Sequence, residues 1–202
     1  MSNKLFFARI ALTTLALSGS LAAQAADFNF SGQLVYQKDV VQFDFSLANA
    51  GTVSIWTDSW QSGLNFDPQL ALFDGNHALQ LVFSDGGDSV SASAGYFDDG
   101  QVFSLLAAGQ YRLTLSTFSN APNGPDLANG FSYDSAAPIA LADWNQPSYD
   151  INANDQKGGA WRVHLSGVQQ AAVVPEPASA ALLLAGLLGV AGVARCRQRG
   201  VL

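Results

Sequence analysis

Apolar and polar residues alternate along several short segments of the chain. The alternation is clearest over residues 41–47, 111–116 and 161–166, and a shorter example lies at 52–55. A period of two residues is typical of β-strands that bury one face and expose the other. The pattern therefore predicts strands at these four places.

Two further segments, 70–73 and 79–83, are apolar at nearly every position. Such strands are often central in a sheet, where both faces are covered. Turn-forming residues separate the predicted strands, at 49–51, 74–76, 85–87, 98–100 and 108–109. Strands at this spacing, without a convincing amphipathic helix, predict an all-β domain of the β-sandwich or jelly-roll type.

The segment from about 119 to 158 departs from this pattern. It contains four of the seven prolines and many Asn, Asp and Gly residues. A loop this long inside a compact domain is usually functional or partly mobile. Its aromatic residues, Phe131, Tyr133, Trp144 and Tyr149, indicate that part of it packs against the domain.

The first 25 residues have the layout of a secretory signal peptide. Lys4 and Arg9 precede an apolar run at 10–21, and small residues follow at 22–26. These small residues satisfy the A-x-A rule for cleavage after Ala25. The alternative is a buried N-terminal helix, which the shortness of the apolar run argues against.

We therefore expect an exported domain at 26–172, held together without disulfide bonds because the only cysteine is Cys196. Residues 27–174 contain fifteen aspartates and four basic residues, a formal charge of −11. Such a domain would be repelled by nucleic acid and by anionic lipid. The only glutamate is Glu176. Because Asp favours turns and caps over helix interiors, this composition agrees with strands joined by tight loops.

The C-terminal segment 173–202 combines three features in order. A Pro-Glu-Pro sequence comes first, then an uncharged stretch at 178–194, then a basic end. The seventeen residues of the middle stretch would form a helix of about 25 Å, enough to cross a thin bilayer. The basic end would stay in the cytoplasm, which leaves the acidic domain outside. The residues of the two polar features are Pro175, Glu176, Pro177, Arg195, Arg197 and Arg199.

This arrangement resembles the PEP-CTERM sorting signal. The resemblance implies that an exosortase, a membrane cysteine transpeptidase, cuts near residues 175–177 after the secretion translocon has exported the chain. It also implies a Gram-negative host, often one that makes exopolysaccharide. The protein would be anchored through its C-terminal helix until processing, and would then lie at the cell surface or outside the cell. The alternative is a permanent single-pass membrane anchor.

A second resemblance concerns the exported domain. Four sequence blocks follow one another at 39–45, 50–55, 67–74 and 108–115. Together they resemble the bacterial pre-peptidase C-terminal domain, a β-sandwich appended to secreted proteases. The resemblance covers about residues 28–118, and a last strand is expected at 159–168. It implies an accessory role such as binding matrix or helping secretion, and some relatives bind calcium. The usual neighbouring catalytic domain is missing, so we expect a free-standing role.

No set of catalytic residues is recognisable in the exported part. It lacks Gly-x-Ser-x-Gly, His-Glu-x-x-His, a phosphate-binding glycine loop and a cysteine nucleophile. The histidines, His77 and His164, are expected in a turn and on the polar side of a strand, as solvated surface residues. With fifteen aspartates some pair is always close, so paired-carboxylate hydrolysis stays open without being favoured.

No cofactor is required by the sequence, and calcium is the one candidate, because it takes six to eight oxygen ligands of the kind that Asp side chains supply. Two aspartates bracket a predicted strand. Two more lie in the Gly-rich turn after the next strand, which would return close to the first. The alternative is that all are ordinary turn residues bonded to the backbone. The four candidates are Asp67, Asp74, Asp85 and Asp88.

Exposed aromatic residues stack on sugar rings, so an aromatic polysaccharide-binding face is a second candidate site. The alternative is that these residues close the ends of the core. Trp161 alternates with apolar positions and is expected in the core itself. The candidates for the aromatic face are Trp56, Trp60, Trp144 and Tyr149.

The sequence thus favours a non-enzymatic exported surface or extracellular-matrix protein associated with exopolysaccharide. Two alternatives stay open: a small secreted hydrolase that uses Asp-based chemistry, and a calcium-dependent carbohydrate-binding module.

Overall fold

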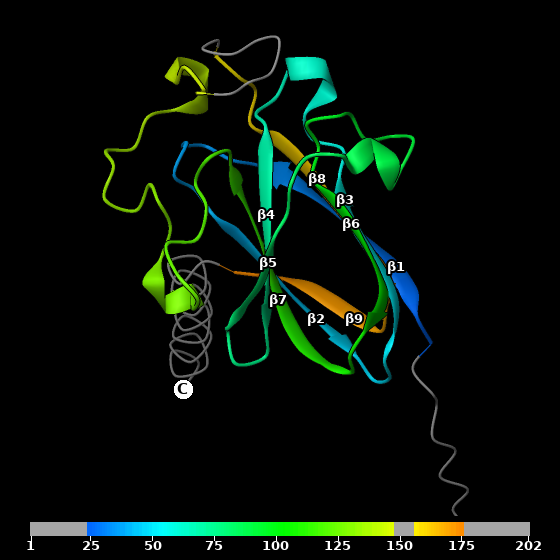
Figure 1. Cartoon of the computed structure of the whole chain (residues 1–202). Helices are drawn as coiled ribbons and strands as arrows, with labels where there is room; N and C mark the ends of the chain where they lie inside the picture. Colours follow the sequence, from blue (N-terminus) through cyan, green and yellow to red (C-terminus); the bar gives the residue numbers. More distant parts are fainter. Residues whose placement is uncertain (1–23, 148–155, 176–202) are drawn as a thin grey trace, which may run out of the picture.

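The computed structural model describes residues 24–147 and 156–175, which form a sandwich of β-strands (Figure 1). The strands are β1 (Ala26–Gln33), β2 (Val41–Leu47), β3 (Gly51–Thr57), β4 (Pro68–Asp74), β5 (Leu79–Val82), β6 (Gly100–Leu106), β7 (Gly109–Thr117), β8 (Ala160–Val168) and β9 (Gln170–Val174). Short 3₁₀ helices lie between them: η1 (Gln61–Gly63), η2 (Gly87–Ser89), η3 (Leu127–Asn129) and η4 (Leu141–Asp143). Within the described ranges, no helix is long and apolar enough to span a membrane.

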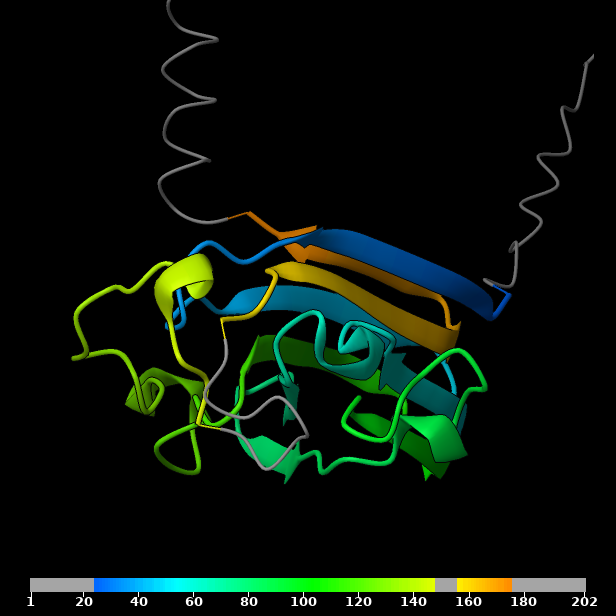
Figure 2. The ribbon, with the colours of Figure 1, turned by 90° about the horizontal axis from the view of Figure 1, so that it is seen from above.

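The strands pair into two layers (Figure 2). One sheet has four strands in the order β1-β8-β3-β6, and the other has five in the order β5-β4-β7-β2-β9. Every ladder between these strands is antiparallel. The predicted all-β sandwich is therefore confirmed.

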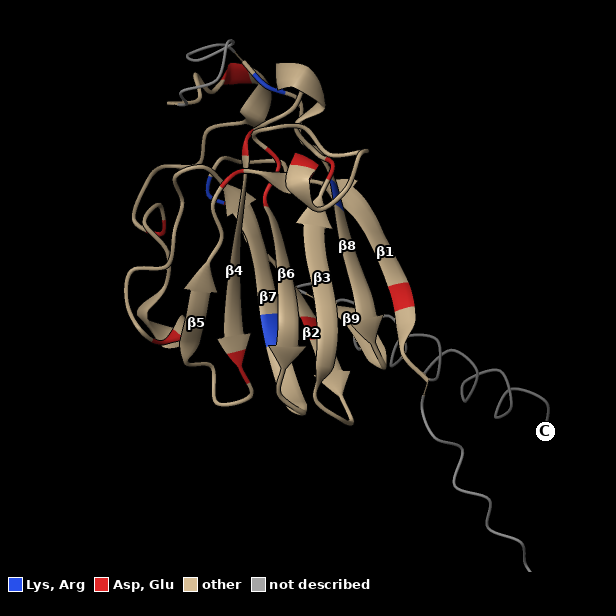
Figure 3. Cartoon of the chain, turned by 45° about the vertical axis from the view of Figure 1, so that its right-hand side comes forward, with Lys and Arg blue, Asp and Glu red and all other residues tan. Residues whose placement is uncertain are grey.

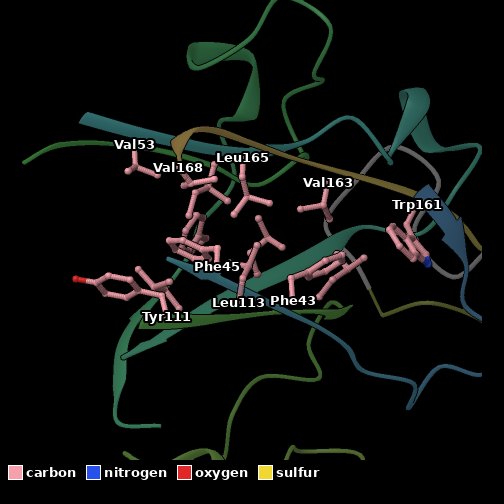
Figure 4. Close-up of a cluster of buried hydrophobic side chains, with 14 of the residues drawn as sticks. Phe43, Phe45, Val53, Tyr111, Leu113, Trp161, Val163, Leu165 and Val168 are labelled. Atoms are coloured by element: carbon pink, nitrogen blue, oxygen red, sulfur yellow. The ribbon is translucent and has the colours of Figure 1, made fainter. Parts of the chain in front are cut away.

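The core lies between the two sheets and is made by the alternating strands (Figure 4). Phe43 of β2, Leu113 of β7 and Leu165 of β8 have no exposed surface. Each such side chain contributes about 1.5–3 kcal/mol relative to an exposed one. Trp161 is 6% exposed and contacts Phe43 edge-on, with ring centroids 5.6 Å apart. The alternation that predicted these strands is thus the alternation between core and outer face, and the placement of Trp161 in the core is confirmed.

The two uniformly apolar segments have different positions in the sheet. β4 is buried along nearly its whole length and lies between β5 and β7, as predicted. The prediction of a central strand at 79–83 was wrong, because β5 is an edge strand. Its apolar character has another cause: the segment after β7 lies along this edge. Leu79 N–H donates to the Pro125 carbonyl over 2.8 Å, and Ala78 pairs with Asp126.

The described part of the long segment, 119–147, is fastened to the sandwich next to β5 (Figure 1). Asn120 is fully buried; its Nδ2 donates to the Lys38 carbonyl, and its Oδ1 accepts from Tyr133 N–H. Trp144 is 8% exposed and contacts Tyr133 edge-on at 6.1 Å. The described part of the segment therefore packs against the domain, as its aromatic residues indicated.

The expected strand at 159–168 is confirmed as β8, but it is not the last strand. After it the chain crosses to the other sheet and forms β9. Gln169 fixes the crossing, because its N–H donates to the Ser46 carbonyl and its Oε1 accepts from Ala48 N–H. β9 runs across the domain boundary that we expected after residue 172. The expected signal peptide, except for its last two residues, and the expected membrane helix at 178–194 lie outside the described residues.

Candidate functional site

Acidic residues gather at the end of the sandwich where β4 begins (Figure 3). The centre of this group is Asp98, which is 1% exposed. Its Oδ1 accepts hydrogen bonds from Thr57 Oγ1 at 2.8 Å, Ser59 N at 2.6 Å and Trp60 N at 3.0 Å. Its Oδ2 accepts from Gly95 N at 2.8 Å. The carboxylate therefore joins the chain after β3 to the loop before β6, a structural task that uses both of its oxygens.

The neighbouring Asp99 is also 1% exposed, and its Oδ2 accepts from Leu70 N–H. Burial raises the pKa of the Asp99 carboxyl well above its usual value. The hydrogen bond from Leu70 lowers the pKa, and the nearby carboxylates of Asp67, Asp85 and Asp98 raise it. A buried carboxyl among other carboxylates is favoured in its neutral form.

The four aspartates predicted to bind calcium do not come together. Asp67 and Asp85 lie near Asp99, as its electrostatics show, but Asp74 lies at the opposite end of β4. There its Oδ1 accepts from two backbone N–H groups of the following turn, which is an ordinary role for a turn aspartate. Asp88 is exposed in η2. Among the residues that the structure describes, no group of three or more His, Cys, Asp or Glu side chains could hold a metal ion. Calcium binding stays a prediction.

A second group of polar residues lies on the outer face of the four-stranded sheet. We call Trp56, Asp58, Arg162 and His164 the outer strip. The Trp56 and His164 rings stack with centroids 4.9 Å apart and an interplanar angle of 12°. Asp58 Oδ1 lies 2.7 Å from Arg162 Nε and 3.2 Å from His164 Nε2. His164 Nδ1 lies 2.6 Å from Asn29 Oδ1. One carboxylate thus links the cation and the aromatic stack.

Strand register brings the outer strip together. Arg162 and His164 are two residues apart on β8, so both point away from the core while Trp161 between them points inward. Across the ladders, His164 stands opposite Trp56 of β3 and Asn29 of β1. His164 was expected on the polar side of its strand, and that placement is confirmed. Its side chain is only 16% exposed, however, because Trp56 covers it.

A pocket with a volume of about 390 Å³ adjoins the outer strip at Arg162. Its polar side chains comprise hydroxyls, amides and the guanidinium, whose side chain is 47% exposed. The lining residues are Ser31, Gly32, Gln33, Ser59, Gln61, Ala160, Trp161 and Arg162.

The four predicted ligand-binding aromatics do not share one face. Trp56 belongs to the outer strip, whereas Trp60 packs on Phe97 at 5.1 Å, at the acidic end. Trp144 is buried in the core cluster. Tyr149 lies outside the described residues.

The Asp58–Arg162 pair and the buried aspartates were not predicted from the sequence. Arg162 could have been found, because it shares the polar side of a predicted strand with His164. Asp98 and Asp99 gave no such signal. They stand before Gly100, where the sequence looks like any other turn.

The C-terminal residues match a known sorting motif. Residues 173–198 match the model of the PEP-CTERM protein-sorting motif. The chain carries a PEP-CTERM sorting motif. The match includes the Pro-Glu-Pro sequence at 175–177 and the first two arginines of the basic end, while Arg199 lies just beyond it. A PEP-CTERM motif implies export, anchoring in the membrane and processing by an exosortase.

One solved structure similar to this chain is the pre-peptidase C-terminal domain of a collagenase from Bacillus anthracis. The sequence identity is 10% and the TM-score is 0.40. The similarity covers 69% of this chain and 89% of that domain. The comparison with curated proteins finds no match.

The PEP-CTERM motif begins inside the folded domain. Its first two residues, Val173 and Val174, are the last residues of β9 and stand opposite Phe43 and Gln42 of β2. Pro175 follows directly. Strand and sorting motif therefore overlap.

Proposed function

We propose that this PEP-CTERM protein is a non-enzymatic surface or matrix protein of a Gram-negative bacterium, and that its outer strip binds a neutral segment of exopolysaccharide. The observation that carries the proposal is the Asp58–Arg162 pair beside a pocket of hydroxyl and amide side chains.

The chemistry of the pocket suits sugar hydroxyl groups, each of which both donates and accepts hydrogen bonds. Gln33 and Gln61 supply amides that also do both, and Arg162 supplies donors in a fixed fork. Asp58 holds the guanidinium in place, so less conformational entropy is lost when a ligand binds. The Trp56–His164 stack contributes ring surface next to the pocket.

The charge of the domain favours a neutral polysaccharide over an acidic one. Residues 27–174 carry a formal charge of −11, which repels a polyanion. Arg162 does not offset this locally, because its charge is already paired with Asp58. Neutral hexose units are not repelled by the acidic domain and need no unpaired cation for binding.

The described acidic groups support a non-enzymatic role. Asp98 and Asp99 are each 1% exposed and hydrogen-bond to the backbone, so a substrate would not reach them without a rearrangement. His164 is covered by Trp56 and flanked by Asn29. Asp98, Asp99 and His164 thus have structural roles.

A glycan array probed with the purified exported protein tests the proposal, with calcium and with chelator. We expect binding to neutral polysaccharides that Arg162→Ala and Gln33→Ala both abolish. Tyr96→Ala is the matched control. Tyr96 is an exposed aromatic residue, 61% exposed, that contacts Phe97 at the acidic end and lies outside the strip. This variant should bind as the wild type does.

Other results would assign a different binding site or a different function. Binding lost in Tyr96→Ala but kept in Arg162→Ala would move the site to the aromatic group around Trp60. Binding lost only in chelator would favour the calcium-dependent module. Turnover of a bound glycan that a single Asp change removes would overturn the non-enzymatic assignment in favour of a secreted hydrolase.

A further inference from the structure

β9 has an unusual place in this sandwich, because it is both an edge strand and the start of the sorting motif. It has five residues and pairs on one side only, with β2. β8, by comparison, has nine residues and pairs on both sides, with β1 and β3. Among the strands of the five-stranded sheet, β9 and β5 are the two that have a single neighbour.

The side chains of β9 hold it to the sandwich weakly. Ala171 packs against the core cluster, but Gln170 and Ala172 are exposed and Val173 is 40% exposed. The strand therefore depends mainly on its backbone ladder to β2. Segments with few buried apolar contacts are the ones that open locally while the rest of a domain stays folded.

The residue between β8 and β9 limits how much of the chain can detach when β9 opens. Gln169 is bonded to Ser46 and Ala48 through its backbone N–H and its side chain. These two bonds do not depend on the β9 ladder, so they would stay in place while β9 comes away. Gln169 then marks the point at which the opening stops.

Processing needs space that the docked strand does not provide. With β9 paired, only Pro175 lies between the ladder and Glu176 of the sorting motif. A membrane peptidase would have to work directly against the body of the sandwich. β2 also occupies one backbone edge of Val173 and Val174, which an enzyme that binds an extended substrate would use. With β9 unpaired, its five residues give an extended spacer of about 17 Å.

We propose that β9 detaches from β2 during sorting and serves as the extended segment that the exosortase receives. It docks again on β2 in the processed protein. The strand is thus part of the fold before and after sorting, and part of the enzyme's substrate during it. This inference rests on the ladder and the motif match, and is independent of polysaccharide binding.

A cross-strand disulfide tests the proposal in the full-length precursor. Asp44 and Ala172 stand directly opposite each other on the outer face, before the matched motif begins. Residues so paired have Cα atoms about 4.5–5.5 Å apart, within disulfide range. Asp44→Cys with Ala172→Cys, in a Cys196→Ser background, joins β9 to β2. The control, Ser46→Cys with Gln110→Cys, joins β2 to β7 and leaves β9 free.

Pulse-chase labelling in cells that make the exosortase measures conversion of precursor to product, and thiol labelling shows that each bond has formed. We expect the β2–β9 disulfide to cause loss of the mature form, while the β2–β7 control and the two single-cysteine variants mature normally. Five Gly and Ser residues inserted between Ala172 and Val173 should restore maturation of the bonded variant.

Normal maturation of a precursor with the β2–β9 bond formed would overturn the proposal. So would a bonded variant that stays blocked despite the inserted residues, because the spacer role would then be excluded. A block in the β2–β7 control would show that any added bond stops sorting, and would equally contradict a specific role of β9.

Discussion

Asp98 offers the sharpest test of how this fold is held together, because one carboxylate joins two stretches of chain, residues 57–60 and the loop before β6. Its replacement by alanine removes the acceptor for Thr57 Oγ1 and for the N–H groups of Ser59, Trp60 and Gly95. The first two of these hydrogen bonds are buried and the other two are partly buried. Water can reach only the partly buried pair as a substitute partner.

The magnitude follows from those two classes of donor. A buried donor left without a partner costs about 1–3 kcal/mol, and a partly buried one costs less. We therefore expect Asp98→Ala to lower the free energy of unfolding by about 4 kcal/mol, a large share of the 5–15 kcal/mol typical of a domain. Asp98→Asn keeps one oxygen as an acceptor. Its amide nitrogen, which is a donor, then faces either Gly95 N–H or the other three donors. This substitution should cost about 1–2 kcal/mol.

Urea unfolding of the purified exported protein, followed by tryptophan fluorescence, measures the effect. With a slope of about 2 kcal/mol per molar urea, Asp98→Ala should lower the midpoint by about 2 M. Asp88→Ala is the matched control, since it removes the same charge from an exposed aspartate in the adjacent η2. Equal midpoints for Asp98→Ala and Asp88→Ala would refute the reasoning, because the loss would then reflect charge alone.

Three further predictions concern stability. Asp99 has its pKa raised by burial, so its contribution to stability is fully present below the unfolded pKa, near 3.8, and is lost as the pH rises through the folded pKa. Stability curves at several pH values should show the stability of Asp99→Asn rising relative to that of the wild type as the pH increases above the unfolded pKa; parallel curves would contradict this. Gly32→Ala would place a methyl group 2.5 Å from Trp161 Cζ2, and thermal unfolding should show a loss of about 1–3 kcal/mol. Gly167 has φ +87°, so Gly167→Ala should cost about 1–3 kcal/mol by the same assay, whereas Gly51→Ala should cost less, because a Cβ added there would meet no atom within 4 Å.

The alternation of apolar residues was sufficient to predict the centre of the fold. It located β2, β3, β7 and β8, because in these strands one face meets the core and the other meets solvent. It did not locate β1, β6 and β9, which are edge strands without a fully buried residue. It misplaced β5 as central, since the cover over its edge comes from a segment more than forty residues later.

The candidate site was harder to predict, because its parts come from distant stretches of chain. Asp58 meets Arg162 across a separation of 104 residues, a contact set by strand order and invisible to local patterns. Trp56 was predicted to belong to an exposed aromatic face, whereas in the structure it stacks on His164. The sorting motif was predictable because all its parts are contiguous in sequence, so no folding was needed to bring them together.

The intact mass of the protein recovered from the cell surface tests the central claim, sorting through the PEP-CTERM motif, most directly. In cells with the exosortase we predict a chain that begins after Ala25 and ends near residues 175–177, with β9 kept and the basic end removed. In cells without the enzyme, or with Pro175, Glu176 and Pro177 all changed to alanine, the mass should retain the C-terminal segment. A surface product that extends to Leu202 in cells with the exosortase would contradict the account.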